Sequence, residues 1–135
     1  MEKKLTVAAD LRQLTVLGKE AQATRKLEAF PNHHEERDYT VTLHTTEFTC
    51  VCPLTGHPDF AEIRIQYIPD RHILESKSLK LYLQSFRNEG TFHEHVVNVI
   101  LDDIVAALSP RWCKIKADFA VRGGVGIGVE AEYRK

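Results

Sequence analysis

The strongest constraint on the fold is a helical periodicity between residues 92 and 108. Apolar side chains recur there every three or four residues, along one face of a helix, and Pro110 follows the last of them. This apolar stripe consists of Phe92, Val96, Val97, Ile100, Leu101, Ile104, Val105 and Leu108. A shorter stripe precedes it, and we expect Gly90 to end that helix. The shorter stripe consists of Leu79, Tyr82, Leu83 and Phe86.

Segments that alternate between apolar and polar residues flank the two helices. Two lie before them, at residues 39–44 and 62–67, and two lie after them, at residues 113–121 and 125–131. Two glycines at positions 123–124 separate the last pair, as in a tight hairpin. The order strand, strand, helix, helix, strand, strand (ββααββ) predicts an α+β domain: a four-stranded antiparallel sheet with both helices on one face.

The length of 135 residues suits a single domain with a core of its own. We expect residues 1–36 to form an N-terminal arm, because Gly18, Pro31 and a polar run break any periodicity there, and residues 37–135 to form the single folded domain. A small open sheet leaves two unpaired edges, and joining neighbouring sheets into a closed barrel removes them. We therefore expect a ring-shaped homo-oligomer with ligand sites at the subunit boundaries.

Composition excludes several classes of protein. No apolar run approaches the ~18 residues that span a bilayer, and the first residues lead into no signal-peptide core, so we expect a cytoplasmic protein without a membrane partner. A formal net charge of -1 lacks the positive excess that is typical of nucleic-acid-binding proteins. We therefore expect a small-molecule ligand. Three cysteines argue against a disulfide framework. Because Cys50-x-Cys52 is not the spacing of structural zinc sites, we expect no metal.

Residues 47–60 are predicted to form a rigid loop between two strands. Pro53, Gly56 and Pro58 disfavour helix and sheet interiors. The loop carries Cys52 directly before a proline and Asp59 further on, which would place a nucleophile and a proton carrier on one segment. From these residues alone, a small buried thiol in an ordinary turn is equally compatible.

A basic face lies on the first predicted helix, opposite its apolar stripe. Lys77, Lys80, Gln84 and Arg87 share that face at helical spacing. Charge on a helix exterior is usually only a solvated surface. The same residues would also form a cationic strip suited to the phosphate groups of a ligand. No glycine-rich phosphate loop accompanies them, so a nucleotide here would not use the doubly wound dinucleotide fold.

Two acid–base candidates stand at the start of the second predicted helix. Thr91-x-x-Glu94 has the form of a capping box, which we favour from the spacing alone. The alternative is that the Glu94 carboxylate accepts two N–H donors from a guanine-like edge. His93 is either a proton donor near neutral pH or a surface histidine.

These segments together resemble the single-domain NADPH-dependent preQ0 reductases, the nitrile reductases of queuosine biosynthesis, over residues 14–135. The resemblance rests on three blocks: Phe48-Thr49-x-x-Cys52-Pro53-x-Thr55-x-x-Pro58-Asp59-Phe60, Glu75-Ser76-Lys77-Ser78-Leu79-Lys80-x-Tyr82, and Phe92-His93-Glu94. It implies the tunnelling fold, in which sheets from several subunits form stacked rings with active sites between subunits. It also implies that NADPH reduces the nitrile of preQ0 (7-cyano-7-deazaguanine) to the aminomethyl group of preQ1.

The resemblance also implies roles for individual residues. Cys52 would add to the nitrile carbon and form a covalent thioimidate, and Asp59 would relay the proton with help from His93. Glu94, with His93, would hold the deazaguanine edge. The residues implied in NADPH binding are Glu75, Ser76, Lys77, Lys80, Tyr82 and Arg87.

Three other functions remain open at this point. An amidine-forming transferase of archaeosine synthesis would share Cys52 and Asp59 but would not need NADPH, so the block around Lys77 and Lys80 counts against it. A zinc-dependent pterin cyclohydrolase of the same fold class would require a metal site. A nucleobase-binding module would carry no chemistry, which the presence of nucleophile, proton carrier and basic strip together disfavours.

Overall fold

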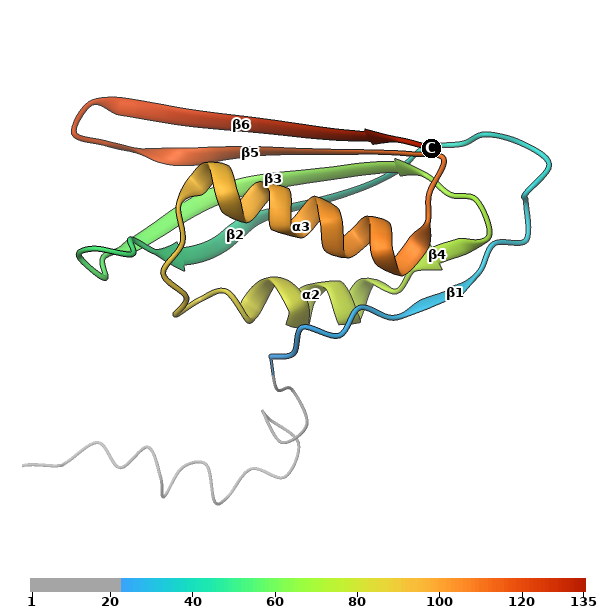
Figure 1. Cartoon of the computed structure of the whole chain (residues 1–135), viewed down its shortest axis with the longest axis horizontal. Coiled ribbons are helices and arrows are strands. Elements are labelled where there is room, and N and C mark those ends of the chain that lie inside the picture. The colour runs from blue at the N-terminus through green and yellow to red at the C-terminus, as the bar shows by residue number, and fades with distance from the viewer. Residues whose placement is uncertain (1–22) are drawn as a thin grey trace, which may run out of the picture.

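The computed structural model describes residues 23–135, which form an antiparallel sheet with two helices against one face (Figure 1). The elements in chain order are β1 (Ala29–Pro31), β2 (Val41–Val51), β3 (Pro58–Ile68), β4 (His72–Leu74), α2 (Ser76–Gln84), α3 (His93–Leu108), β5 (Trp112–Arg122) and β6 (Val125–Arg134). Among the described residues, no helix is long and apolar enough to cross a membrane.

The main sheet has four strands in the order β2-β3-β5-β6, and every neighbouring pair is antiparallel. The predicted ββααββ arrangement with both helices on one face is therefore confirmed. The hairpin between β5 and β6 is also as expected. Gly123 and Gly124 have φ values of 59° and 79°, and two positive φ angles are what a tight two-residue hairpin requires.

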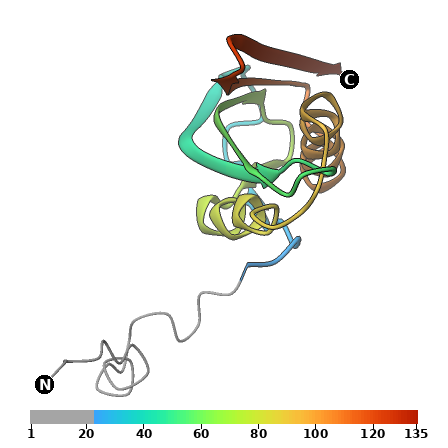
Figure 2. The ribbon, with the colours of Figure 1, turned by 90° about the vertical axis from the view of Figure 1, so that its left-hand side faces the viewer.

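The core lies between the sheet and the helices (Figure 2). Strand alternation directs one set of side chains inward and the other set to the open face, where Glu62, Arg64 and Lys116 are exposed. The inward set from β3 and β5 comprises Ala61, Ile63, Ile65, Tyr67, Cys113, Ile115, Ala117 and Phe119. Helix α3 buries Val96, Val97, Ile100, Leu101, Ile104 and Leu108 against this set. The helical stripe read from the sequence is thus the core face, apart from Phe92, which is 68% exposed, and Val105, which is half-buried.

A second, two-stranded sheet was not predicted. β1 and β4 pair in antiparallel register, from Ala29 opposite Leu74 to Pro31 opposite His72. Each strand has three residues, too few for alternation to be visible in a sequence. β1 belongs to the segment expected to be the N-terminal arm, so residues 29–31 are paired with the domain. Residues 1–22 of that arm lie outside the described residues.

The predicted boundaries of the cysteine loop are wrong. β2 continues to Val51 and β3 begins at Pro58, so the loop contains only Cys52 to His57. Pro58 is the first residue of its strand, a position where the missing N–H of proline is tolerated. The shorter loop leaves Asp59 on a strand, where its backbone pairs with Cys50 of β2.

Candidate active site

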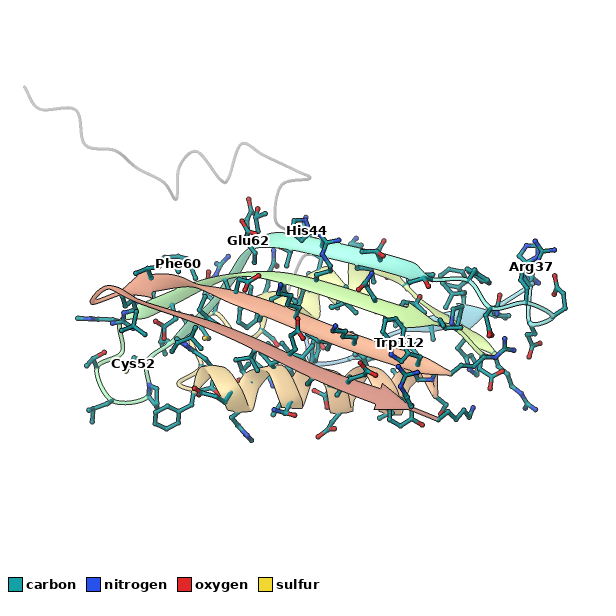
Figure 3. All side chains as sticks on the ribbon, turned by 90° about the horizontal axis from the view of Figure 1, so that it is seen from above. Arg37, His44, Cys52, Phe60, Glu62 and Trp112 are labelled. Carbon is teal, nitrogen blue, oxygen red and sulfur yellow. The ribbon has the colours of Figure 1, made fainter. Side chains whose placement is uncertain are left out.

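The loop that carries Cys52 is closed by its own backbone hydrogen bonds. The Cys52 N–H donates to the His57 carbonyl at 2.8 Å, and the Gly56 N–H donates to the Cys52 carbonyl at 2.9 Å. Gly56 has φ 72°, a conformation that glycine adopts at little cost. Figure 3 shows Cys52 at the end of the molecule opposite Arg37. The thiol is thus carried on a constrained turn, as the prolines suggested.

The segment before α3 anchors this loop. Val51 donates its N–H to the Glu89 carbonyl at 3.0 Å and accepts from the Thr91 N–H at 3.1 Å. A Cβ at Gly90 would lie 3.1 Å from Cα of Pro53, tighter than ordinary contact. The expectation that Gly90 ends the first helix is therefore wrong, because α2 already ends at Gln84. Gly90 instead permits the close approach of two backbone segments.

The Cys52 thiol is partly exposed and lies among hydrogen-bond donors. The Thr55 hydroxyl lowers the pKa of this thiol below its ordinary value, and the backbone N–H groups of Thr55 and Leu54 act in the same direction. The charge of Arg122 lowers this pKa further. The His57 N–H donates to the Thr55 hydroxyl oxygen at 3.3 Å, which leaves the hydroxyl hydrogen for the sulfur. The loop therefore favours the thiolate, the nucleophilic form of cysteine.

The other two cysteines differ from Cys52 in exposure and in the direction of their pKa shift. Cys50 and Cys113 are fully buried. Burial, with a smaller contribution from the Asp59 charge, raises the pKa of Cys50 to about 11. Burial alone raises the pKa of Cys113 to about 12. Cys52 is therefore the cysteine suited to nucleophilic chemistry, and the buried-thiol interpretation applies to the other two.

We predict that iodoacetamide alkylates Cys52 far faster than Cys50 or Cys113 in the folded protein near neutral pH. Thr55→Val, which removes the donor to the sulfur, should raise the pKa of Cys52 and move the alkylation profile to higher pH. Thr42→Val, on an exposed position of β2, is the matched control and should leave the profile unchanged. Peptide mass spectrometry of labelled protein measures each rate, and labelling of Cys50 at the rate of Cys52 would contradict this prediction.

Asp59 lies at the centre of a charged cluster beside the loop. Its side chain is 4% exposed, and both carboxylate oxygens have a partner. Arg122 Nη1 lies 2.5 Å from Oδ1, and His93 Nε2 lies 3.1 Å from Oδ2. A carboxylate buried to this degree requires such partners, because desolvation of an unpaired charge is costly. The structure thus brings Asp59 and His93 together, as the resemblance implied.

The imidazole of His93 is fixed by stacking. Its ring lies parallel to that of Phe119 on β5, with 3.8 Å between centroids and 5° between planes. His93 is also the first residue of α3, so the helix start determines its backbone position. These constraints direct Nε2 to the Asp59 carboxylate, where His93 can assist in proton transfer.

The predicted capping box at the start of α3 is wrong. The N-cap residue is Phe92, and no side chain caps this helix end. The Thr91 hydroxyl donates to the Phe92 carbonyl at 3.3 Å instead. Glu94 is exposed in the first turn, and within residues 23–135 its carboxylate makes no hydrogen bond or ion pair with a side chain. The Glu94 carboxylate is therefore available to a ligand.

A groove of about 380 Å³ lies between α2 and β2. The helix contributes the polar and basic side chains of Ser76, Lys80 and Gln84 to it. Arg87, which was expected on the same helix, lines the groove from the turn that follows, because α2 ends at Gln84. Strand β2 contributes Leu43, His44, Thr45, Glu47 and Thr49, and the remaining lining is apolar: Ile63, Ile65, Leu79 and Leu83. Lys77 and Lys80 line a second hollow on the helix. Basic and polar side chains above an apolar base fit a ligand with phosphates and a flat ring.

Two residues expected at the cofactor have internal partners. Glu75 is the N-cap of α2 and accepts from the Lys77 and Ser78 N–H groups at 2.8 and 2.6 Å, which lowers the pKa of this carboxyl. Tyr82 is fully buried, and its hydroxyl donates to Asp103 at 2.5 Å. Burial, with Asp103, raises the pKa of this hydroxyl. These placements fit support of α2 and do not fit a direct contact of Tyr82 with a cofactor.

Sequence reasoning missed Arg122 and Phe119 as members of the site. Phe119 was visible as part of an alternating strand but not as the partner of a histidine. The only signal for Arg122 is indirect: a buried aspartate requires a cation, and sequence does not say which arginine supplies it. Within residues 23–135, no group of three or more His, Cys, Asp or Glu side chains is arranged to hold a metal ion.

Comparison with known proteins gives consistent matches. A relative from Syntrophus aciditrophicus named NADPH-dependent 7-cyano-7-deazaguanine reductase is 69% identical over 132 residues, covering 98% of this chain and 94% of that one. Relatives of the same name from Anaeromyxobacter sp. (strain K) and Thermomicrobium roseum are 56% and 55% identical, covering 83% and 84% of this chain and 92% and 89% of theirs.

A solved structure, the archaeosine synthase QueF-Like in the apo form, matches with a TM-score of 0.64 and 29% identity. The match covers 69% of this chain and 91% of that one. The family model described as QueF-like protein matches residues 58–135. This segment holds Asp59, the groove residues that α2 contributes, His93 and Arg122. With the arrangement of these residues and the level of identity, the chain belongs to the QueF-like protein family.

Proposed function

We propose that this protein reduces the nitrile of preQ0 to the aminomethyl group of preQ1 with NADPH, in queuosine biosynthesis. The observation that carries the proposal is the partly exposed Cys52 thiol with a lowered pKa, next to the nearly buried Asp59 carboxylate and its partners His93 and Arg122. The relatives of 55% to 69% identity carry the name of this activity. The free state of all three cysteines fits the reducing cytoplasm, the compartment we expect.

The first step is addition of Cys52 to the nitrile. Nitriles resist direct hydride attack, and covalent catalysis replaces one difficult step by easier ones. A bond forms between Sγ and the nitrile carbon, one carbon–nitrogen π bond breaks, and the nitrogen takes up a proton. Asp59 accepts the thiol proton and passes it to that nitrogen, with His93 assisting. The product is a thioimidate, whose carbon accepts a hydride.

NADPH, when bound, supplies the hydrides for two successive reductions. After the first, the C–S bond breaks and Cys52 leaves as the thiolate, which gives an imine. The second reduction converts the imine to the amine. Each reduction requires one proton at the nitrogen, a role that we assign to Asp59 and His93, which contact each other. A thiolate with a lowered pKa is also the better leaving group.

Glu94 is the residue we propose to hold the nucleobase. Its exposed carboxylate neighbours His93 in the first turn of α3, and two carboxylate oxygens match two adjacent N–H donors of a guanine-like edge. Lys80, Arg87 and Ser76 in the groove, with Lys77 beside it, would hold the phosphates of NADPH. Glu75 and Tyr82 would support this surface through the helix cap and the core.

The assembly we propose is a ring of subunits with the active site between them, as in the tunnelling fold. β2 and β6 are the edges of the main sheet, so both are free to pair with a neighbouring chain. Phe60, Val121 and Val125 are more than half exposed, which fits burial in an interface. Cys52, Asp59 and His93 do not line the α2 groove of their own chain. A neighbouring subunit would bring a groove to each thiol.

The competing function is an amidine-forming transferase, since the solved structure that matches at 29% identity is an archaeosine synthase. That reaction consumes no NADPH. Incubation with preQ0 and NADPH distinguishes the two: oxidation of NADPH with formation of the aminomethyl product supports the reductase. Formation of an amidine from preQ0 and an ammonia donor, without NADPH oxidation, would support the transferase and exclude our proposal.

Lys80→Ala is expected to raise the KM for NADPH roughly 10-fold or more, since charge-assisted phosphate contacts contribute about 1.5–3 kcal/mol. The adduct between Cys52 and preQ0 should form at the wild-type rate, because the lysine lines the groove away from the thiol. Lys116→Ala, which removes the same charge from the open face of β5, is the matched control for steady-state kinetics. Loss of the adduct in Lys80→Ala would show that this lysine is structural.

A further inference from the structure

Arg122 contacts the candidate proton carrier directly, although the reaction steps proposed above assign it no part. Its Nη1 lies 2.5 Å from Asp59 Oδ1, although its own side chain is 45% exposed. A half-exposed arginine and a nearly buried carboxylate thus form an ion pair at the edge of the site. Such a pair is charge-assisted and directional, because the guanidinium presents its donors in a fixed plane.

We propose that Arg122 is a positioning residue for the addition step: it pairs with the Asp59 carboxylate and holds it in place to accept the proton of the Cys52 thiol. Arg122 acts through Asp59 and contacts neither the nitrile carbon nor the nitrogen in this account. The inference rests on the proposed function, because it assigns a part in the proposed covalent step.

An irregularity in β5 brings Arg122 to this position. The strand alternates regularly from Cys113 to Phe119, with every second side chain buried. Its pairing with β6 then shifts register between Phe119 and Arg122. Strict alternation would turn Val121 toward the buried face and Arg122 toward the open face. Val121 is instead 66% exposed, and Arg122 reaches the buried Asp59. β-bulges of this kind frequently redirect a side chain beside an active site.

The carboxylate is held from two sides. Oδ1 contacts Arg122 from β5, and Oδ2 contacts His93 from α3. An ionised carboxylate has about four lone-pair positions, so two contacts leave capacity to accept a further proton. Arg122 and His93 therefore fix the orientation of Asp59 without blocking it as a base.

The charges around Asp59 explain why the arginine is needed. The titratable or charged groups that face it are Arg122 from β5, His93 from α3 and the buried Cys50 from β2. Arginine is charged at every relevant pH, whereas histidine is charged only when protonated. Without Arg122, a carboxylate that is 4% exposed would lose its permanent counter-charge and the contact that fixes Oδ1.

The same guanidinium acts on the nucleophile. Its charge lowers the pKa of the Cys52 thiol, after the larger effect of the Thr55 hydroxyl and the loop N–H groups. Loss of Arg122 would therefore release the acceptor from its ion pair and disfavour the thiolate form of the nucleophile. The effect on the thiol moves the acid side of the pH profile toward higher pH.

The test is the rate of adduct formation between preQ0 and Cys52 without NADPH, measured against pH by intact mass. Arg122→Gln should slow the reaction roughly 10- to 100-fold near neutral pH and move the acid limb upward, within the range of general acid–base effects. Arg122→Lys should recover part of the rate, because it retains the charge and loses the planar fork. Arg64→Gln, which changes an exposed arginine on the inner strand β3, is the matched control.

A double-mutant cycle keeps the test decisive if Arg122→Gln alone lowers stability. Arg122→Gln should slow the reaction far less in Asp59→Asn than in the wild type, because most of its effect passes through the aspartate and only the smaller effect on the Cys52 thiol remains. Additive effects would overturn the inference. So would a wild-type adduct rate and pH profile in Arg122→Gln with a raised KM for NADPH, which would make the arginine a cofactor contact. If the wild type forms no adduct, the proposed function fails and this inference fails with it.

Discussion

Replacing Cys52 with alanine is expected to abolish the preQ0 adduct and to reduce NADPH oxidation by at least about 10⁴-fold, the scale on which removal of a covalent nucleophile acts. The physical reason is that hydride does not add readily to the unactivated nitrile. The fold should be unaffected, because the Cys52 side chain is partly exposed and lies outside the core. Intact mass and NADPH absorbance measure the two signals.

Cys113→Ala is the matched control for Cys52→Ala. It removes a thiol that is buried and whose pKa is raised to about 12, so its cost should be in stability and not in chemistry. Truncation of this small buried side chain should lower the free energy of unfolding by about 1 kcal/mol. Measurable turnover of preQ0 by Cys52→Ala would mean that hydride reaches the nitrile without a covalent step.

Asp59→Asn is expected to slow adduct formation roughly 10²- to 10⁴-fold, because the amide keeps the shape of the carboxylate but cannot take the thiol proton. The variant also leaves Arg122 without its counter-charge and places an amide against His93. Rapid mixing with preQ0, followed by quenching and mass measurement at several pH values, gives the rate.

Asp118→Asn is the control for the aspartate, since it makes the same change on the exposed face of β5. It should form the adduct at the wild-type rate. An Asp59→Asn variant that forms the adduct as fast as the wild type would show that another group, His93 being the nearest, takes the thiol proton. The acid–base part of the mechanism would then pass from the aspartate to the histidine.

The main elements could be predicted from the sequence because their faces differ strongly in polarity. On β3, Ile63 and Ile65 alternate with Glu62 and Arg64, and α3 repeats apolar residues over four turns. In both elements the residues that are apolar in the periodic pattern are the ones that are buried. β1 and β4 are held by pairing with each other and by backbone contacts, which leave no periodic signal. Short elements of that kind form only through contacts with distant segments, so the local sequence does not predict them.

The errors at the site have the same origin. The spacing of Thr91 and Glu94 fits a capping box, but the chain before α3 is bound to β2 by its backbone, and Phe92 takes the N-cap position. Gly90 has the composition of a helix stop, yet its function is the close approach to Pro53. In both cases a contact between segments distant in sequence overrides a local preference.

The candidate nucleophile and proton carrier could be named in advance, but their partners could not. Cys52 and Asp59 stand in a recognisable sequence block, so the resemblance identified them. Arg122 reaches Asp59 only because β5 shifts register near its end, and a one-residue irregularity cannot be read from an alternating pattern. Residues that position and pair with the catalytic groups are thus harder to predict than the catalytic groups themselves.

The most direct test of this account is the mass of the wild-type protein after incubation with preQ0 in the absence of NADPH. The account predicts an increase by the mass of one preQ0 molecule per active chain, located by peptide mapping on Cys52 and lost when NADPH is added. An unmodified Cys52 in a protein that nevertheless oxidises NADPH with preQ0 would contradict the covalent mechanism.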